Sequence, residues 1–172
     1  MRNLRVPNSD ALDPPARRAS WLFPWWNRDQ ARGPMQWRAG PGGGFTSGRP
    51  SLPLGPDTEA RNVAAQSGEP ASVLSMYRRL VQLRRSIPAL ALGDQQLLDV
   101  RDPDVLAYRR SLDGRSAVVA LNFASRSAGI RLPTLADGAS WQVALPSDAR
   151  EAGARLSDTV TLSPLEVLIA YD

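Results

Sequence analysis

The sequence contains neither cysteine nor histidine. Without cysteine, the chain can form no disulfide framework and no thiolate metal site, and we expect it to act in a reducing compartment, the cytoplasm. Without histidine, it lacks both the commonest general base and the commonest ligand of transition metals. A Ser–His or Cys–His catalytic pair is therefore excluded, and we expect no metal ion and no cofactor.

Lysine is absent as well, so all 21 basic residues are arginines, which face 17 acidic residues for a net charge of +4. This excess would permit nucleic-acid binding, but the arginines are spread among carboxylates and form no stripe, so we expect no nucleic-acid partner. Every apolar run is far shorter than the roughly 20 residues that a membrane-spanning helix needs. No apolar run follows the arginines near the start, so we expect neither a membrane span nor a signal peptide.

One long helix is predicted over residues 70–87, where apolar side chains recur at helical spacing from Val73 to Ile87. Ser67 is the best N-cap candidate, and Pro88 ends the pattern. The arginines of this helix lie on its outer face, where a solvated surface is a better interpretation than an anion site. The preceding residues, 38–70, are rich in glycine and proline and predict a long irregular loop.

From residue 95 onward the pattern changes to short β-strands separated by turn residues. Asp113 and Gly114 separate two apolar runs, which predicts a hairpin with a type I′ turn, since both central residues of that turn need positive φ. Strands are expected around residues 105–108, 117–121, 130–132, 141–145, 160–162 and 167–170. Short strands at this spacing predict a small antiparallel sandwich, so the fold class is mainly β with one long helix.

The most unusual segment is the loop predicted over residues 27–46. It begins Asn-Arg-Asp-Gln-Ala-Arg-Gly-Pro-Met-Gln-Trp and continues through a glycine-rich run to Phe45 and Thr46. Two arginines, a carboxylate and a tryptophan within ten positions suit the binding of a planar polar ligand. The alternative is structural: an arginine–aspartate staple under a tryptophan lid would use the same residues without any ligand.

This segment resembles a signature of the α-glucosidase branch of the α-amylase superfamily, glycoside hydrolase family 13. The matching pattern is Arg-Asp-x-x-Arg-x-Pro-Met-Gln-Trp, followed after a few residues by Gly-Phe-Thr. Asp13-Pro14 resembles a short element ahead of the signature, and residues 72–90 resemble the last helix of the family's (β/α)8 barrel and its exit. Residues 106–110 and 118–123 resemble the first strands of the β-sandwich that closes these enzymes.

The resemblance implies that residues 1–90 are a remnant of the catalytic barrel and that residues 91–172 form the closing sandwich. Arg28 is then similar to the arginine that holds glucose beside a carboxylate from the first barrel loop, which this chain lacks. The other matching residues would shape the loop: Asp29, Arg32, Met35, Gln36, Trp37 and Phe45. Asp29, between two arginines, is expected to be a salt-bridged structural acid. Gly33 and Arg38 depart from the usual Thr and Asp, which softens the loop and removes a charge from the pocket side.

The catalytic carboxylates of the family lie on earlier barrel strands. Two of the sequence motifs on those strands contain histidine. Because this chain has no histidine, it resembles the C-terminal part of a larger enzyme, and we expect it to be inactive alone. In a whole enzyme its partner would be an α-glucoside, a malto- or isomalto-oligosaccharide. The remaining acids fall mainly in turns and show no pairing of the kind that glycoside hydrolysis needs.

Two other interpretations stay open. A stand-alone carbohydrate-binding module could use Trp21, Trp25 and Trp26 as a platform, because the faces of sugar rings pack on aromatic rings. The same cluster could instead belong to a core or a pocket rim. Alternatively, the helix over residues 70–87 could dock a separately encoded barrel, since an apolar face without a partner marks an interaction site.

Overall fold

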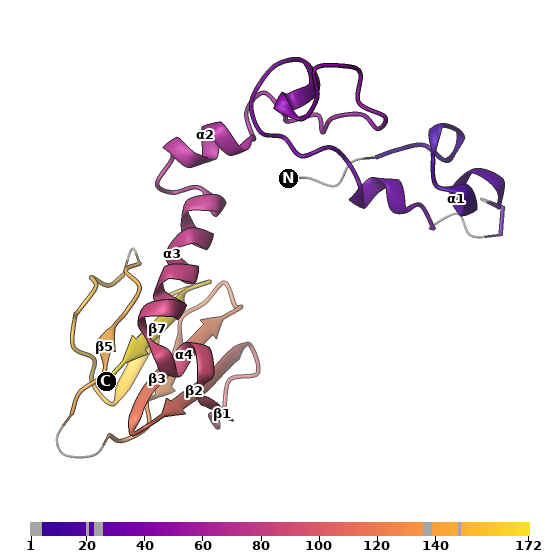
Figure 1. Ribbon diagram of the computed structural model, residues 1–172. Helices are drawn as coiled ribbons and strands as arrows, with labels where there is room; N and C mark the ends of the chain where they lie inside the picture. The colour runs from indigo at the N-terminus through magenta and orange to yellow at the C-terminus, as the bar shows by residue number, and fades with distance from the viewer. Residues whose placement is uncertain (1–4, 20, 23–25, 136–138, 148) are drawn as a thin grey trace. The chain divides into compact units, whose positions relative to one another are not determined.

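The computed structural model describes residues 5–19, 21–22, 26–135, 139–147 and 149–172 (Figure 1). The chain forms two compact units, Met1–Arg78 and Arg79–Asp172. We describe each unit by itself. The division lies inside the long helix α3, Val73–Ser86. The boundary after residue 90, which the family resemblance implied, stays a prediction.

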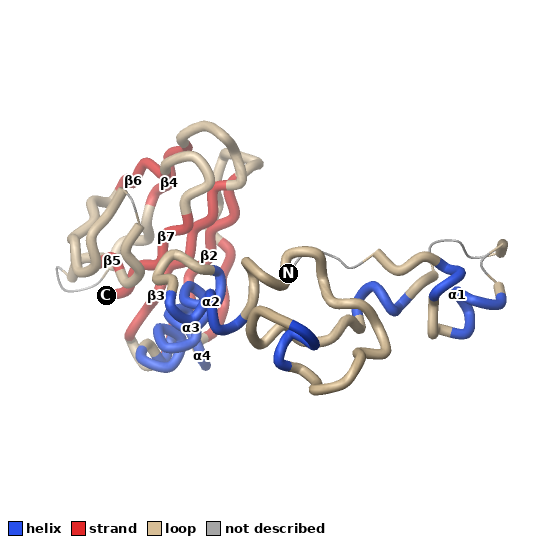
Figure 2. The backbone as a smooth tube through the Cα atoms, turned by 90° about the horizontal axis from the view of Figure 1, so that it is seen from above, coloured by secondary structure: helices blue, strands red, loops and turns tan. Residues whose placement is uncertain are grey.

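The first unit consists mainly of loops held by short helical turns (Figure 2). The turns are η1 (Asn8–Asp10), α1 (Pro14–Arg18), η2 (Arg28–Ala31), η3 (Pro41–Gly44) and α2 (Val63–Gly68). The helix α2 corrects our prediction of an irregular loop over residues 38–70. Asn62 caps α2, because its side chain accepts a hydrogen bond from the N–H of Ala65, at 2.9 Å.

The predicted long helix is present but shorter than the range 70–87, since α3 begins at Val73 and ends at Ser86. The N-cap prediction was wrong: Ser67 lies inside α2. Ser72 takes that role, because its Oγ accepts a hydrogen bond from the N–H of Ser75, at 3.1 Å. Pro88 begins the next helix, α4 (Pro88–Leu92), where its missing N–H costs no hydrogen bond.

The second unit contains two antiparallel sheets. The larger has the strand order β1-β2-β3-β7-β5, and the smaller pairs β4 with β6. Their bounds are β1 (Asp94–Leu97), β2 (Val105–Leu112), β3 (Arg115–Asn122), β4 (Ala128–Arg131), β5 (Gln142–Val143), β6 (Thr159–Leu162) and β7 (Val167–Tyr171). The hairpin prediction is confirmed: β2 pairs with β3 around Asp113 and Gly114, whose φ values are 49° and 81°. Strand β1 was not predicted.

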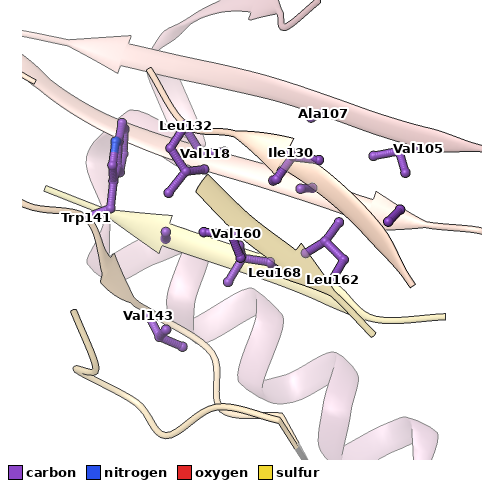
Figure 3. Close-up of a cluster of buried hydrophobic side chains, with 13 residues drawn as sticks. Val105, Ala107, Val118, Ile130, Leu132, Trp141, Val143, Val160, Leu162 and Leu168 are labelled. Carbon is purple, nitrogen blue, oxygen red and sulfur yellow. The ribbon is translucent and has the colours of Figure 1, made fainter. Parts of the chain in front are cut away.

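Alternation along the strands builds a core on each face of the larger sheet. On one face, Val118 and Leu168 join Ile130, Leu162 and Trp141 in a cluster to which both sheets contribute (Figure 3). On the other face, Val119 and Ile169 pack with Leu90 of α4 and with Leu80 and Leu83 of α3. The apolar face of α3 is thus covered at its C-terminal half.

The N-terminal half of α3 is different. Val73 and Tyr77 expose 81% and 65% of their surface, so these two predicted apolar-face positions are not buried. Both lie in the first unit, Met1–Arg78.

None of the helices in the described part of the chain is apolar over a length sufficient to cross a bilayer.

The junction of α4 and β1 depends on a glycine. A Cβ added to Gly93 would lie 2.6 Å from the carbonyl oxygen of Ala89 and 2.8 to 2.9 Å from backbone atoms of Ser111. Neither neighbour is a flexible side chain, so the strand or the helix would have to move. Gly129, on β4, has no atom within 4 Å of its added Cβ.

We therefore expect Gly93→Ala to destabilise the protein by about 1–3 kcal/mol through overpacking. The matched variant Gly129→Ala should change the free energy of unfolding by less than about 0.5 kcal/mol or raise it slightly. Urea unfolding monitored by circular dichroism measures both. Equal stability of the two variants would show that the backbone at residue 93 has room for a side chain.

Candidate functional site

The candidate loop is anchored by an ion pair between Arg28 and Asp13. Nη2 of Arg28 lies 2.5 Å from Oδ1 of Asp13, and Nε donates to both carboxylate oxygens at 3.0 and 3.1 Å. The backbone N–H of Arg28 donates to the same carboxylate at 3.2 Å. The Asp13 side chain is fully buried, whereas that of Arg28 is 49% exposed. The guanidinium is therefore fixed along one edge and open along the other.

The family resemblance implied that a carboxylate from the first barrel loop, absent from this chain, would lie beside Arg28, and that remains a prediction. Within the chain itself, the sequence reasoning named no acid for Arg28 other than the neighbouring Asp29. Asp13 is the partner, and Nη1 of Arg32 also lies 3.9 Å from it. Asp13 was noticed only as part of an Asp-Pro element. Its position before a proline pair, with arginines on the loop that follows, was the available signal.

Asp29 also differs from its predicted role as a salt-bridged acid. It is buried, and Oδ2 accepts hydrogen bonds from the backbone N–H groups of Leu12 and Asp13, at 2.6 and 3.0 Å. Both neighbouring arginines pair with Asp13 instead. The two acids thus have different roles. Asp29 binds the backbone of the earlier segment, and Asp13 of that segment pairs with Arg28.

Asn27 completes this network. Its Nδ2 donates to the carbonyl oxygen of Val6 at 2.8 Å and to Oδ1 of Asn8 at 3.1 Å. Its Oδ1 accepts from the N–H of Asp29 at 3.1 Å, which caps the turn η2. Three consecutive loop residues therefore bind the segment that precedes them, although 15 to 21 positions separate the partners.

The next part of the loop is closed by glycine. The N–H groups of Trp37 and Arg38 both donate to the carbonyl oxygen of Gly43, at 2.8 and 3.0 Å. Gly42, Gly43 and Gly44 have φ values of 69°, 60° and 71°, a left-handed conformation that other residues rarely adopt. The glycine run therefore lets the chain fold back sharply on the Gln36–Arg38 segment.

The helix α2 holds the same segment from its other side. The N–H groups of Val63 and Ala64, in the first turn of α2, donate to the carbonyl oxygens of Gln36 and Trp37, each at 2.9 Å. The first N–H groups of a helix have no acceptor within the helix itself. These two bonds therefore pair the N–H groups of α2 with the carbonyl groups of the loop. The side chain of Gln36 is buried and donates to Oγ1 of Thr58. Sequence reasoning did not identify Thr58 or Asn62 as supports of the loop.

The remaining predicted residues lie at the surface or near it. Trp37 and Phe45 expose 50% and 55% of their surface, and Met35 is half-buried. Trp21 and Trp26 expose 81% and 46%, whereas Trp25 lies outside the described residues. The loop thus combines an open guanidinium edge with exposed aromatic rings.

Carboxylates in the described part of the chain form no group of three or more metal-binding side chains. Asp102 and Asp104 both pair with Arg126, and Glu166 pairs with Arg150. These acids are thus held by arginines. The arrangement leaves one edge of the Arg28 guanidinium open to a polar ligand.

Residues 1–93 match the model of the alpha-amylase catalytic domain. The chain belongs to the α-amylase family. It is 37% identical over 106 residues to an oligo-1,6-glucosidase from Parageobacillus thermoglucosidasius, an alignment that covers 62% of this chain and 19% of that protein. It is 30% identical over 145 residues to a trehalose-6-phosphate hydrolase from Bacillus subtilis, covering 83% of this chain and 25% of that protein.

Solved structures agree with this assignment. The trehalulose synthase MutB from Pseudomonas mesoacidophila superposes with a TM-score of 0.77 and 30% identity over 99% of this chain, which corresponds to 33% of the synthase. A variant of trehalulose synthase MutB in complex with Tris reaches a TM-score of 0.81 at 29% identity, over 100% of this chain and 34% of that one. The chain thus spans about a fifth of the length of the first curated relative and a third of these synthases.

The Asp13–Arg28 pair makes a prediction about pH. Hydrogen bonds from the Arg28 side chain lower the pKa of Asp13 below its ordinary 3.8, an effect that burial opposes without cancelling. The pair therefore contributes its full stabilisation above pH 3.8 and loses it as the pH falls through the lower pKa of the folded state.

We expect an NMR titration of the Asp13 carboxyl carbon to show a midpoint below 3.8, and Arg28→Ala to move that midpoint upward. Arg17→Ala, which removes an exposed arginine from α1, serves as the control and should leave the midpoint in place. If Arg28→Ala left the midpoint of Asp13 unchanged, the ion pair would not persist in solution.

Proposed function

We propose that this chain supplies the glucose-binding loop of an α-glucosidase that acts on α-linked gluco-oligosaccharides. The observation that carries the proposal is the half-exposed guanidinium of Arg28, which buried Asp13 fixes along one edge. Membership of the α-amylase family supports the reaction class. Its relatives include an oligo-1,6-glucosidase and a trehalose-6-phosphate hydrolase.

The geometry suits a sugar hydroxyl. Arg28 uses Nε and Nη2 for Asp13, and in the described part of the chain Nη1 has no acceptor at hydrogen-bond distance. A guanidinium donates along fixed directions, so the ion pair aims these remaining N–H groups. Vicinal hydroxyls of a glucose ring would accept from Nη1 at the exposed edge of Arg28. Asp13 acts as a positioning residue, and Asp29 holds the backbone that carries it.

Residues 1–90 would then be a part of the catalytic (β/α)8 barrel, with α3 as its last helix, and residues 91–172 would be the closing β-sandwich. An uncovered apolar row on the larger sheet supports this arrangement. Leu106 pairs with Leu121, and Leu121 pairs with Val167. Leu106 and Val167 are 43% and 40% exposed, on the face that α3 and α4 cover elsewhere. Further catalytic-domain residues would cover this row in a whole enzyme.

The carboxylates for retaining hydrolysis would come from outside this chain, because its own acids are tied to arginines or lie apart. Gly33 and Arg38 would distinguish its pocket from those of relatives. The stem of Arg38 packs at Gly44, where an added Cβ would lie 2.7 Å from its Cγ. This contact holds an arginine beside the loop in place of the usual aspartate.

The isolated chain should release no glucose from maltose, isomaltose or an aryl α-glucoside, because it lacks the opposed carboxylates. A glucose-release assay on the purified chain tests this directly. Turnover that Arg28→Ala abolishes would contradict the proposal, since it would place catalysis within these residues.

The role of Arg28 can be tested in a chimera that joins the N-terminal part of the Parageobacillus oligo-1,6-glucosidase to this chain. We expect Arg28→Ala to lower kcat/KM for isomaltose about 10- to 100-fold, the effect of losing one or two charged hydrogen bonds. Arg17→Ala should leave kcat/KM unchanged. An active chimera that is insensitive to Arg28→Ala would remove the glucose-binding assignment.

A second candidate is a stand-alone carbohydrate-binding module, favoured by the 81% exposure of Trp21. Exposed indole rings would pack against sugar faces. In that case millimolar maltose should quench tryptophan fluorescence, and Trp21→Ala should reduce the quenching. Absence of quenching would remove this candidate while leaving the α-glucosidase proposal intact.

A further inference from the structure

The second unit contains a hollow of about 370 Å³ that the proposed reaction does not use. It lies where the end of α3 and the start of α4 meet the β2–β3 hairpin and the last strand; Figure 1 shows these elements near the end marked C. Its volume is at the lower end of the range for small-molecule sites. The lining residues are Ser86, Ile87, Pro88, Ala89, Leu112, Asp113, Arg115, Ser116, Tyr171 and Asp172.

The floor of the hollow is apolar. Ile87 and Leu112 are half-buried and pack against the core beneath α4, to which Ala89 also belongs. Pro88 lies at the first position of α4, and Tyr171 ends β7. These side chains come from elements that the sheet and the two helices hold together. A flat ligand with C–H groups on one side would meet a preformed surface here.

The rim is polar, and two of its charged side chains have few or no hydrogen bonds within the described chain. Asp113 is in the hairpin turn, and within the described chain its carboxylate has no hydrogen bond and no ion pair. Arg115, 79% exposed, is tied only loosely: its Nη1 lies 3.9 Å from Oδ1 of Asp172 and 3.4 Å from the Asp172 carbonyl oxygen. Asp172 is better satisfied, because Oδ2 accepts from the N–H of Ser116 at 3.0 Å. An acceptor and a donor therefore flank the apolar floor.

We propose that this hollow is a second, non-catalytic binding site for one pyranose unit of an oligosaccharide. A pyranose offers an apolar face to the floor, hydroxyl hydrogens to Asp113 and hydroxyl oxygens to Arg115. A neutral ligand suits a rim that carries both signs of charge. An amphipathic cation would be attracted by Asp113 but would approach the guanidinium of Arg115 at the same rim.

This inference uses only residues 86–172 and does not depend on Arg28, on catalysis or on the missing carboxylates. It goes beyond the proposed function, because the loop over residues 27–46 takes no part in it.

The test is a ¹⁵N NMR titration of the whole chain with maltose and isomaltose, from micromolar to tens of millimolar. We expect saturable shifts at residues 86–89, 112–116 and 171–172. Arginine methyl ester serves as the cationic comparison. Shifts confined to residues 27–46, no shifts at all, or tighter binding of the cation than of either sugar would each overturn the proposal.

Two variants make the test specific. Ser86→Trp places an indole in the hollow from an exposed position at the end of α3 and should abolish the shifts elsewhere in the site. Gln82→Trp, exposed on the same helix but outside the hollow, is the matched control and should bind normally. Asp113→Asn keeps a residue that tolerates positive φ and should weaken binding about tenfold by removing a charged acceptor. Equal binding by Ser86→Trp and Gln82→Trp would contradict the site.

Discussion

The candidate loop depends on the buried carboxylate of Asp13, whose hydrogen bonds and charge partner come from Arg28. Asp13 has no exposed side-chain surface, and Arg28 supplies both its charge partner and most of its hydrogen bonds. Burying an unpaired carboxylate would be very costly, so the segment that carries Asp13 can pack only when Arg28 is in place. The same requirement fixes the guanidinium, because a bidentate pair defines the plane of both groups. The packing of this segment and the orientation of the Arg28 guanidinium are thus set by one ion pair.

Around this pair, the first unit is held by polar bonds more than by apolar burial. Its cluster of buried apolar side chains within the described residues consists of Val6 and Leu52. Asn27, Asp29 and Gln36 are buried instead, each with defined partners. Hydrogen bonds are directional, so they position a loop more narrowly than apolar contacts do, and they leave little tolerance for a missing partner.

The sequence predicted those features whose chemistry is local. Asp113-Gly114 specifies a hairpin because both residues accept positive φ, and the apolar spacing of residues 80–87 specifies a buried helix face. The family motif located the loop. What failed was pairing over distance: the nearest acid to Arg28 in sequence is Asp29, but the backbone turns at η2 and directs the two side chains to different partners. The helix α2 escaped prediction because its stability comes from capping and from bonds to Gln36 and Trp37, which no periodicity reveals.

The two units therefore solve different problems with different forces. In the second unit, each face of the larger sheet carries an apolar core, so the hairpin and α4 are held by apolar burial, whose strength scales with area and depends little on charge. In the first unit, polar groups stay aligned without a large core. Arginine suits this, because it keeps its charge at any physiological pH while Asp13 keeps a lowered pKa beside it. A lysine in place of Arg28 would supply the charge but not two parallel hydrogen bonds. The ion pair would remain, but its geometry would no longer be fixed.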